Sequence, residues 1–277
     1  MITFFLLIMF MGWTFSYILE SPIILIVSVL FSVGMNIVAY WYSDKIVLKT
    51  AGAHEADPHQ YRELHNIVEN LAITAGLPKP KVYVIEDRAP NAFATGRDKE
   101  HAVVAATTGL LGMLDHTELE GVMAHELSHI GNRDILISTI VVVLVGFVTL
   151  LSDFFLRMAF YGGGGDRDGR VQLFAIIAGI VLSILAPLIA TLIQLAISRK
   201  REFLADSSGA LLTRYPDGLA SALKKIEGYQ GELKHANHAT AHLYISNPFK
   251  GKHVKSVVGR LFMTHPKTED RVKALVG

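Results

Sequence analysis

Long uncharged stretches alternate with polar segments along this chain, and the two patterns predict different structures. The uncharged stretches are Ile2–Leu19, Pro22–Ser43, Ile135–Ser152 and Val171–Ser198. A helix of roughly 20 apolar residues crosses the hydrocarbon core of a bilayer, within a range of about 17–25, and all four stretches are long enough. We therefore predict four transmembrane helices, arranged as one hairpin at residues 1–43 and a second hairpin inserted at 135–197.

The polar segments, 44–134 and 198–277, carry the shorter patterns of a domain that mixes helices with strands. A helix is predicted to begin at Asp57-Pro58 and to run to about Ala75, where Gly76 ends it. β-branched content predicts strands at Lys81–Ile85, Asn91–Thr95 and Ala102–Ala106. Further helices are predicted at 201–215, after Pro216 and at Thr268–Val276. The two segments are expected to form one α+β domain.

One predicted helix carries the sequence AHELSHIG, which contains the H-E-x-x-H pattern. Thr117 and Glu120 form a capping box that is expected to begin this helix. Residues i and i+4 lie on one helical face, so His125 and His129 can direct both imidazoles at one point. Catalytic zinc takes three protein ligands and leaves a fourth position for water. A third ligand is therefore needed from elsewhere in the chain.

The third ligand cannot come from the extended H-E-x-x-H-x-x-G-x-x-H pattern, because Asn132 and Ile135 occupy its glycine and histidine positions. A glutamate from a second helix remains, and Glu202 in RREFLADS is the strongest candidate. The alternative is that Glu202 is a solvated acid among basic neighbours. Asp206 lies four residues further on the same face, where it could accept a hydrogen bond from a ligand histidine and fix its tautomer.

Composition favours a membrane protein and removes other classes. The chain of 277 residues is 51% hydrophobic and only 18% charged, whereas soluble domains carry about 25% charged residues. It contains no cysteine, which excludes disulfides and thiolate metal ligands. The net charge of +1 gives no reason to expect a nucleic-acid partner.

Basic residues near the ends of the predicted spans indicate the side of the membrane on which the polar segments lie. The side with both polar segments carries Lys45, Lys49, Arg62, Arg133, Arg199, Lys200, Arg201 and Arg214. The opposite side carries only Arg157, Arg167 and Arg170. The positive-inside rule therefore places both polar segments in the cytoplasm. The H-E-x-x-H pattern ends shortly before the third span and Glu202 follows the fourth, so the site is expected at the cytoplasmic membrane surface.

Sequences spread over the whole chain resemble the HtpX family of membrane-integrated zinc metalloproteases, which are relatives of the CAAX prenyl proteases. These sequences are AHELSHIGNRD, REFLADS, PNAFATG, NPF (Asn247–Phe249) and THPKTEDR. The resemblance implies a membrane α-helical protein with four transmembrane helices and an α+β zincin-like (gluzincin) catalytic domain. The two halves of that domain would be 44–134, with the H-E-x-x-H helix, and 198–277, with the third ligand.

The resemblance also implies roles for individual residues. It implies one Zn²⁺ per chain on His125, His129 and Glu202, with Glu126 as the general base. A strand beside the cleft would pair with the substrate backbone, which gives affinity with little demand on sequence; its residues are Asn91, Ala92, Phe93, Ala94 and Thr95. By similarity to the prenyl proteases, His265 would assist the transition state. An anionic intermediate needs hydrogen-bond donors besides the metal, and the Asn91 side chain is a second candidate for that role.

One arginine of the C-terminal THPKTEDR sequence has two possible partners. Arg271 can pair with Asp206 or with Glu269, and spacing favours neither.

These expectations describe an integral, multi-pass protease of the bacterial cytoplasmic (inner) membrane. By the resemblance, it would cleave misfolded or damaged membrane proteins in protein quality control and the stress response, so its partners are membrane protein substrates and the lipid bilayer. One alternative is a processing protease for lipidated C-termini. Another is a non-catalytic membrane scaffold or metal transporter, although transport is favoured by charged residues inside the spans and the four stretches carry none.

Overall fold

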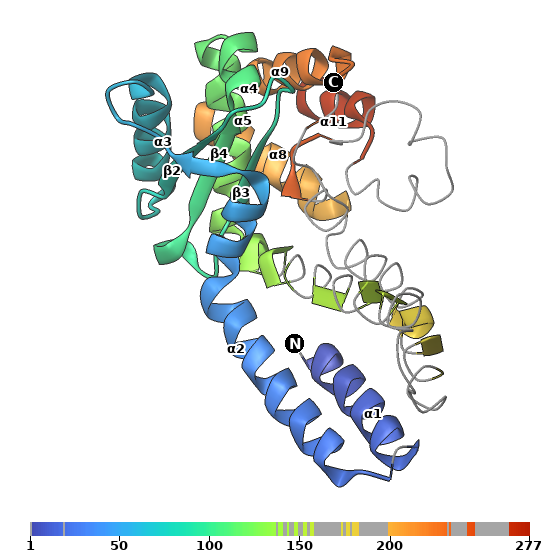
Figure 1. Ribbon diagram of the computed structural model, residues 1–277. Helices are drawn as coiled ribbons and strands as arrows, with labels where there is room; N and C mark the ends of the chain where they lie inside the picture. Colours follow the sequence, from blue (N-terminus) through green and yellow to red (C-terminus); the bar gives the residue numbers. More distant parts are fainter. Residues whose placement is uncertain are drawn as a thin grey trace. The chain divides into compact units, whose positions relative to one another are not determined.

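The computed structural model divides the chain into two compact units. The apolar unit comprises Met1–Ser43 and Ile140–Ala190, and the polar unit comprises Asp44–Thr139 and Thr191–Gly277. The structure describes residues 2–18, 20–136, 138–140, scattered positions between 143 and 182, 199–231, 233, 243–246 and 266–277. Figure 1 draws these parts as coloured ribbons.

The chain begins with a helical hairpin of α1 (Ile2–Ile18) and α2 (Pro22–Ala51), and α2 belongs to the apolar unit as far as Ser43 (Figure 1). The two helices approach closely at Gly12, where an added Cβ would lie 2.4 Å from the Ser28 side chain. Within the described part of the chain, α2 is the one helix that is long and apolar enough to cross a membrane. The stretches at 135–152 and 171–198 lie mostly outside the described residues, so the four transmembrane helices stay a prediction.

A four-stranded mixed sheet forms one layer of the polar unit. Its strands are β1 (Ala53–Glu55), β2 (Lys81–Ile85), β3 (Ala92–Thr95) and β4 (Val103–Thr107). Their order is β1-β2-β4-β3, with β2 parallel to β4 and each outer strand antiparallel to its neighbour. The three predicted strands are confirmed to within one residue. The three residues of β1 were not predicted, because so short a strand has no pattern of its own.

The helices of the polar unit lie against this sheet and against one another (Figure 1). Their bounds are Arg62–Ala75 for α3, Thr108–Met113 for α4, His116–Gly131 for α5, Arg199–Thr213 for α8, Pro216–Gly228 for α9 and Thr268–Val276 for α11, with a 3₁₀ turn, η1, at Lys99–His101. Gly76 ends α3 in the left-handed conformation, with φ of 64°. The predicted start of α3 at Asp57 is wrong, because the Asp57 side chain accepts the backbone N–H groups of His59 and Gln60 in a separate turn.

The capping box of α5 begins two residues before the predicted one. The N-cap is Asp115, whose side chain accepts the Glu118 N–H, and the Glu118 side chain accepts the Asp115 N–H in return. The predicted pair of Thr117 and Glu120 is therefore wrong. Long-range contacts decide between the registers, because the buried Glu118 carboxylate also accepts hydrogen bonds from Ser221 at 2.6 Å and Lys225 at 2.6 Å in α9.

Helix α5 is the central element of the polar unit, packed between the sheet and the helices α8 and α9. Most of its residues are buried, including Val122 and Leu127 in the hydrophobic core. Close approach depends on glycine at two crossings. A Cβ on Gly121 would lie 2.7 Å from the Leu219 backbone N in α9, and a Cβ on Gly209 of α8 would lie 3.0 Å from the His125 backbone N. The second crossing brings α8 against the part of α5 that carries the motif.

Replacing Gly209 with Ala should separate α8 from α5, because neither backbone can yield without moving its helix. We expect the free energy of unfolding to fall by about 1–3 kcal/mol, as for other overpacked sites, in denaturant titrations followed by circular dichroism. Gly112→Ala is the matched control, since its added Cβ meets nothing within 4 Å. Equal stability of the two variants would contradict this account of the crossing.

Candidate metal centre

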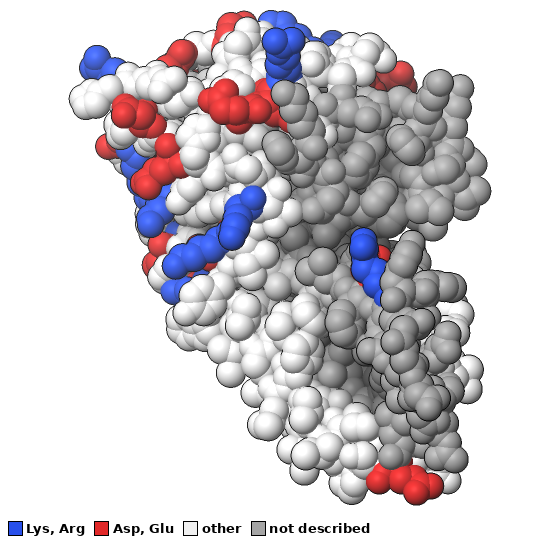
Figure 2. Space-filling view, viewed as in Figure 1, with Lys and Arg blue, Asp and Glu red and all other residues white. Residues whose placement is uncertain are grey.

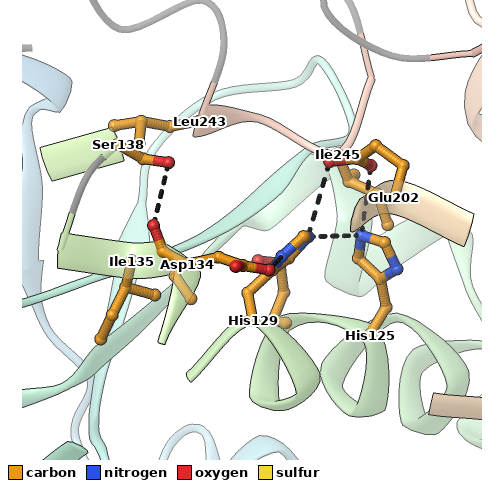
Figure 3. A pocket seen from close by; sticks show the side chains of 10 residues that line it. His125, His129, Asp134, Ile135, Ser138, Glu202, Leu243 and Ile245 are labelled. Atoms are coloured by element: carbon orange, nitrogen blue, oxygen red, sulfur yellow. Dashed lines mark hydrogen bonds and ion pairs between the residues drawn. The ribbon is translucent and has the colours of Figure 1, made fainter. Parts of the chain in front are cut away.

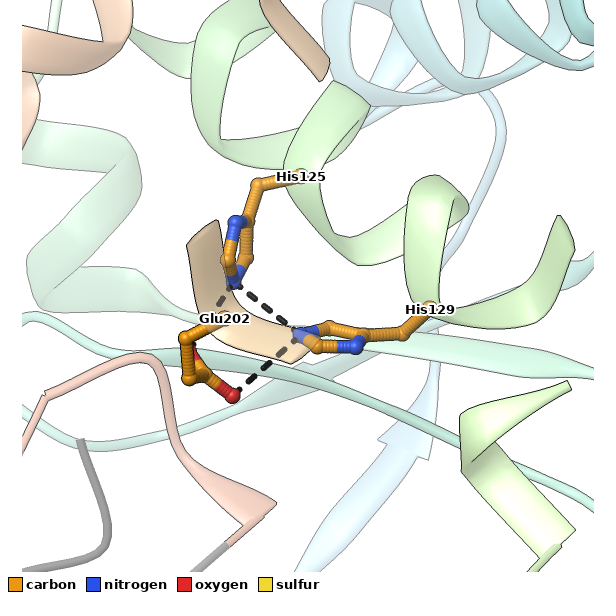
Figure 4. A group of neighbouring side chains, drawn as sticks. All are labelled: His125, His129 and Glu202. Carbon is orange, nitrogen blue, oxygen red and sulfur yellow. Dashed lines mark hydrogen bonds and ion pairs between the residues drawn. The ribbon is translucent and has the colours of Figure 1, made fainter. Parts of the chain in front are cut away.

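Three side chains from two helices of the polar unit meet at one point. His125 and His129 project from the same face of α5, and Glu202 comes from the first turn of α8 (Figure 4). One ligand atom from each residue can be chosen so that all three lie within 4.8 Å of one another. The two Nε2 atoms are 3.2 Å apart, and the Glu202 carboxylate lies 3.8 Å from the Nε2 of His125 and 3.7 Å from that of His129. His125 and Glu202 are buried, so the convergence occurs away from bulk water.

The far side of the His125 ring is held by a buried ion pair. Its Nδ1 lies 2.9 Å from Asp206 Oδ1, and the carboxylate of Asp206 accepts two hydrogen bonds from Arg271 in α11, at 2.8 and 2.6 Å. All three side chains are almost completely buried. A carboxylate can only accept, so His125 carries its proton on Nδ1 and its Nε2 is left to face Glu202. The structure thus pairs Arg271 with Asp206, the choice that spacing left open.

The His129 ring is held in the same manner by a residue that the sequence did not single out. Its Nδ1 lies 3.2 Å from Asp134 Oδ2, and the other oxygen of Asp134 accepts a hydrogen bond from Arg201. Asp134 is buried and follows the end of α5 by a few residues. Figure 3 shows Asp134 beside His129 at the edge of the pocket. The available signal was the position of both residues in the quoted sequences, since Asp134 ends AHELSHIGNRD and Arg201 begins REFLADS.

Glu126 lies between His125 and His129 in sequence and is only 2% exposed. The backbone N–H of Ala94, in the edge strand β3, donates a hydrogen bond to it. The pocket at this point is lined by Glu126, the three converging side chains, Asp134, Ser138 and the apolar residues Ala94, Ile135, Leu243 and Ile245 (Figure 3). A carboxylate that faces a cavity beside three converging ligands is suited to move a proton there.

The arginines of this site do not balance all of its buried carboxylates. Four buried carboxylates lie around the two histidines, those of Glu126, Asp134, Glu202 and Asp206. Arg201 and Arg271 supply two positive charges. Two negative charges therefore remain when the carboxylates are ionised and the histidines are neutral. A divalent cation carries the charge that is needed, and two imidazoles with one carboxylate are a donor set that zinc prefers.

The pKa values of Glu126 and His129 are raised in this environment, whereas the pKa of His125 is lowered. Burial raises the pKa of Glu126 to about 7, and the neighbouring charge of Glu202 adds to the rise. Burial lowers the pKa of His129, but its hydrogen bond to Asp134 and the charge of Glu202 outweigh burial and raise it to about 9. Burial lowers the pKa of His125 to about 4 in spite of its hydrogen bond to Asp206. Protons on Glu126 and His129 thus supply positive charge that a bound metal ion would replace.

The predicted substrate strand is present, but part of its outer edge is occupied by the chain itself. The Ala92 carbonyl accepts the Ile245 N–H at 3.0 Å. The Asn91 side chain donates to the Ser246 carbonyl at 3.0 Å and accepts the Ser246 N–H at 3.3 Å. Phe93 packs edge-on against Tyr244, with ring centroids 5.3 Å apart. The segment Leu243–Ser246 therefore covers β3 at Ala92.

Thr95 and His265 were also predicted to act at the site, Thr95 in substrate binding and His265 in the transition state. The Thr95 hydroxyl lies 2.9 Å from that of Thr139 and is buried, so it packs inside the fold. His265, expected to assist the transition state, lies outside the described residues, as does Asn247–Phe249.

Two histidines of an H-E-x-x-H helix and a glutamate from a second helix define a metallopeptidase site of the His-His-Glu class. The comparison with protein families agrees with this class, because the model of peptidase family M48 matches residues 58–277. The chain belongs to peptidase family M48 and is a metalloprotease, a hydrolase.

Relatives and a solved structure extend the comparison over the whole chain. A "Protease HtpX homolog" of Caldanaerobacter subterraneus subsp. tengcongensis is 48% identical over 270 residues, which cover 96% of this chain and 87% of the relative. One from Thermococcus kodakarensis is 48% identical over 263 residues, covering 94% and 88%. The crystal structure of S. mikatae Ste24p shares the fold, with a TM-score of 0.53 and 18% identity over 100% of this chain and 67% of that one.

Replacing Arg271 with Leu should strongly destabilise the polar unit, because it leaves the Asp206 carboxylate buried without its guanidinium partner. We expect a loss of about 3–5 kcal/mol in the free energy of unfolding, measured by chemical denaturation of the detergent-solubilised protein. The double variant Arg271→Leu/Asp206→Asn removes the buried charge as well and should be more stable than Arg271→Leu alone. A double variant less stable than the single one would contradict this reading of the pair.

Proposed function

We propose that this chain is an integral membrane zinc endopeptidase that hydrolyses peptide bonds of membrane proteins at the cytoplasmic face of the membrane. The observation that carries the proposal is the convergence of His125, His129 and Glu202 beside the buried carboxylate of Glu126. The length and apolar character of α2 support a membrane location. Misfolded or damaged membrane proteins are the substrates we propose, on the basis of the resemblance to the HtpX proteases.

In this proposal His125, His129 and Glu202 hold the zinc ion. Both histidines have their Nδ1 atoms engaged by carboxylates, which leaves both Nε2 atoms directed at the same point. A zinc ion there supplies Lewis acidity that polarises a peptide carbonyl and lowers the pKa of water. The donor set and the excess of two negative charges fit a divalent ion.

Glu126 is the proposed general base. Its carboxylate faces the same pocket as the ligands, so it accepts a proton from the attacking water and delivers that proton to the leaving amine. The Ala94 N–H holds the carboxylate at the edge of β3. Because β3 is covered at Ala92, we propose that a substrate backbone pairs with this edge from Ala94 onward, while Asn91 holds the segment Leu243–Ser246 in place. His265 stays a proposed partner of the transition state.

Replacing Glu126 with Gln should remove the base and keep the ligands. We expect the rate of cleavage of an unfolded membrane protein to fall at least about 100-fold, with the zinc content of the purified protein unchanged. Glu120→Gln, on the same helix but outside the pocket, is the control and should keep full activity. Full activity of the Glu126→Gln protein would overturn the proposed mechanism.

The proposed substrate class is tested in cells. Membranes that contain the Glu126→Gln protein should accumulate membrane proteins that are degraded in membranes with the wild-type or Glu120→Gln protein, as measured by quantitative proteomics. Accumulation of soluble proteins alone would contradict the proposed substrates without affecting the assignment of the zinc site.

A further inference from the structure

Each of the two histidines contacts a carboxylate, and each carboxylate pairs with an arginine. The carboxylate–arginine pair next to His129 has a distinct position in the chain. Behind His125 stand Asp206 and Arg271, both buried. Behind His129 stands Asp134, which is buried, and Arg201, whose side chain is 39% exposed. The first group joins α8 to α11, whereas the second joins the end of α5 to the start of α8.

Asp134 reaches His129 because of the way the chain leaves α5. The helix ends at Gly131, and Arg133 adopts the left-handed conformation, with φ of 61°. This turn brings the Asp134 carboxylate back to the last turn of the helix, where Oδ2 lies 3.2 Å from His129 Nδ1. Since a carboxylate accepts, a proton of His129 lies on Nδ1, and Nε2 is the nitrogen that faces Glu202 and would bind a metal ion after losing its own proton.

Arg201 connects the same carboxylate to the helix that carries the third ligand. It donates to Asp134 Oδ1 across 67 positions of sequence, and Glu202 is the next residue. The side chains of Asp134 and Glu202 both line the pocket. One carboxylate therefore orients a ligand histidine with one oxygen and holds the first turn of α8 with the other.

We propose that Asp134 is a positioning residue for the metal site, and that its pair with Arg201 is a clasp that sets Glu202 against His129. The clasp joins Asp134, the residue before the 135–197 insert, to Arg201, which shortly follows the insert. It therefore links the two halves of the polar unit beside the three metal ligands. This inference rests on the proposed zinc function, because it assigns a role to residues that hold the ligands.

The affinity of the full-length, detergent-solubilised protein for Zn²⁺ tests the clasp. Metal-free protein is titrated with Zn²⁺ against a chromophoric chelator, and the visible spectrum of bound Co²⁺ is recorded as a second readout. We expect Asp134→Asn to weaken Zn²⁺ binding by about 10- to 100-fold, as for other residues that orient metal ligands, and to shift the Co²⁺ bands. Arg201→Gln should weaken binding by about threefold to fivefold, as expected for a half-exposed ion pair.

The double variant and a control separate positioning from general damage. Asp134→Asn/Arg201→Gln should bind Zn²⁺ no more weakly than Asp134→Asn, because both changes break one contact chain. Lys200→Gln, an exposed neighbour, should match the wild type. Thermal unfolding of the metal-free Arg201→Gln protein should remain one cooperative transition above the temperature of the titration, so that its weaker binding reports on the site and not on an unfolded chain.

The possible outcomes distinguish the clasp from the proposed function. If the wild type binds Zn²⁺ and both Asp134→Asn and Arg201→Gln bind it with wild-type affinity, the clasp is overturned and the zinc function stands. If Asp134→Asn disrupts the fold, Arg201→Gln alone decides, and wild-type affinity in that variant overturns the clasp. If the wild type binds no Zn²⁺, both the clasp and the proposed function are wrong.

Discussion

The excess of buried negative charge around His125 and His129 is the constraint on which the rest of this site depends. Carboxylates are costly to bury unless each finds a partner. Arg271 and Arg201 balance two of them, and protons or a divalent cation must balance the others. Arg201 lies in α8 and Arg271 in α11, at opposite ends of the second half of the polar unit. Their ion pairs with the carboxylates around the two histidines therefore hold α8 and α11 against α5. A divalent ion bound at this site would therefore stabilise the folded unit.

The parts of the site that local sequence determines could be predicted. The spacing of His125 and His129 places both rings on one helical face, and the strands of the sheet follow from their β-branched content. Glu202 and Asp206 could be proposed because the E-x-x-x-D spacing repeats the same geometry on a second helix. These features need only the period of a helix or a strand, which a single sequence contains.

The features that the sequence did not predict depend on contacts between distant segments. The sequence offers two capping boxes for α5, one with Glu118 and one with Glu120. The hydrogen bonds of Glu118 to Ser221 and Lys225 in α9 favour the first. The pairing of Arg271 with Asp206 likewise appears only when α11 packs on α8, and the pairing of Arg201 with Asp134 only when α8 packs on α5. The position of Leu243–Ser246 along β3 is a further example, because nothing in its four residues indicates an edge strand.

The zinc content of the purified protein shows whether His125, His129 and Glu202 form a metal site. We expect about one zinc ion per chain in the wild type, and loss of that zinc when Glu202 is replaced by Ala, because the site then lacks its third ligand. Measurement by elemental analysis after removal of loosely bound metal gives this ratio without any assumption about substrates. Wild-type protein without zinc, or Glu202→Ala protein that keeps a full complement, would contradict the account.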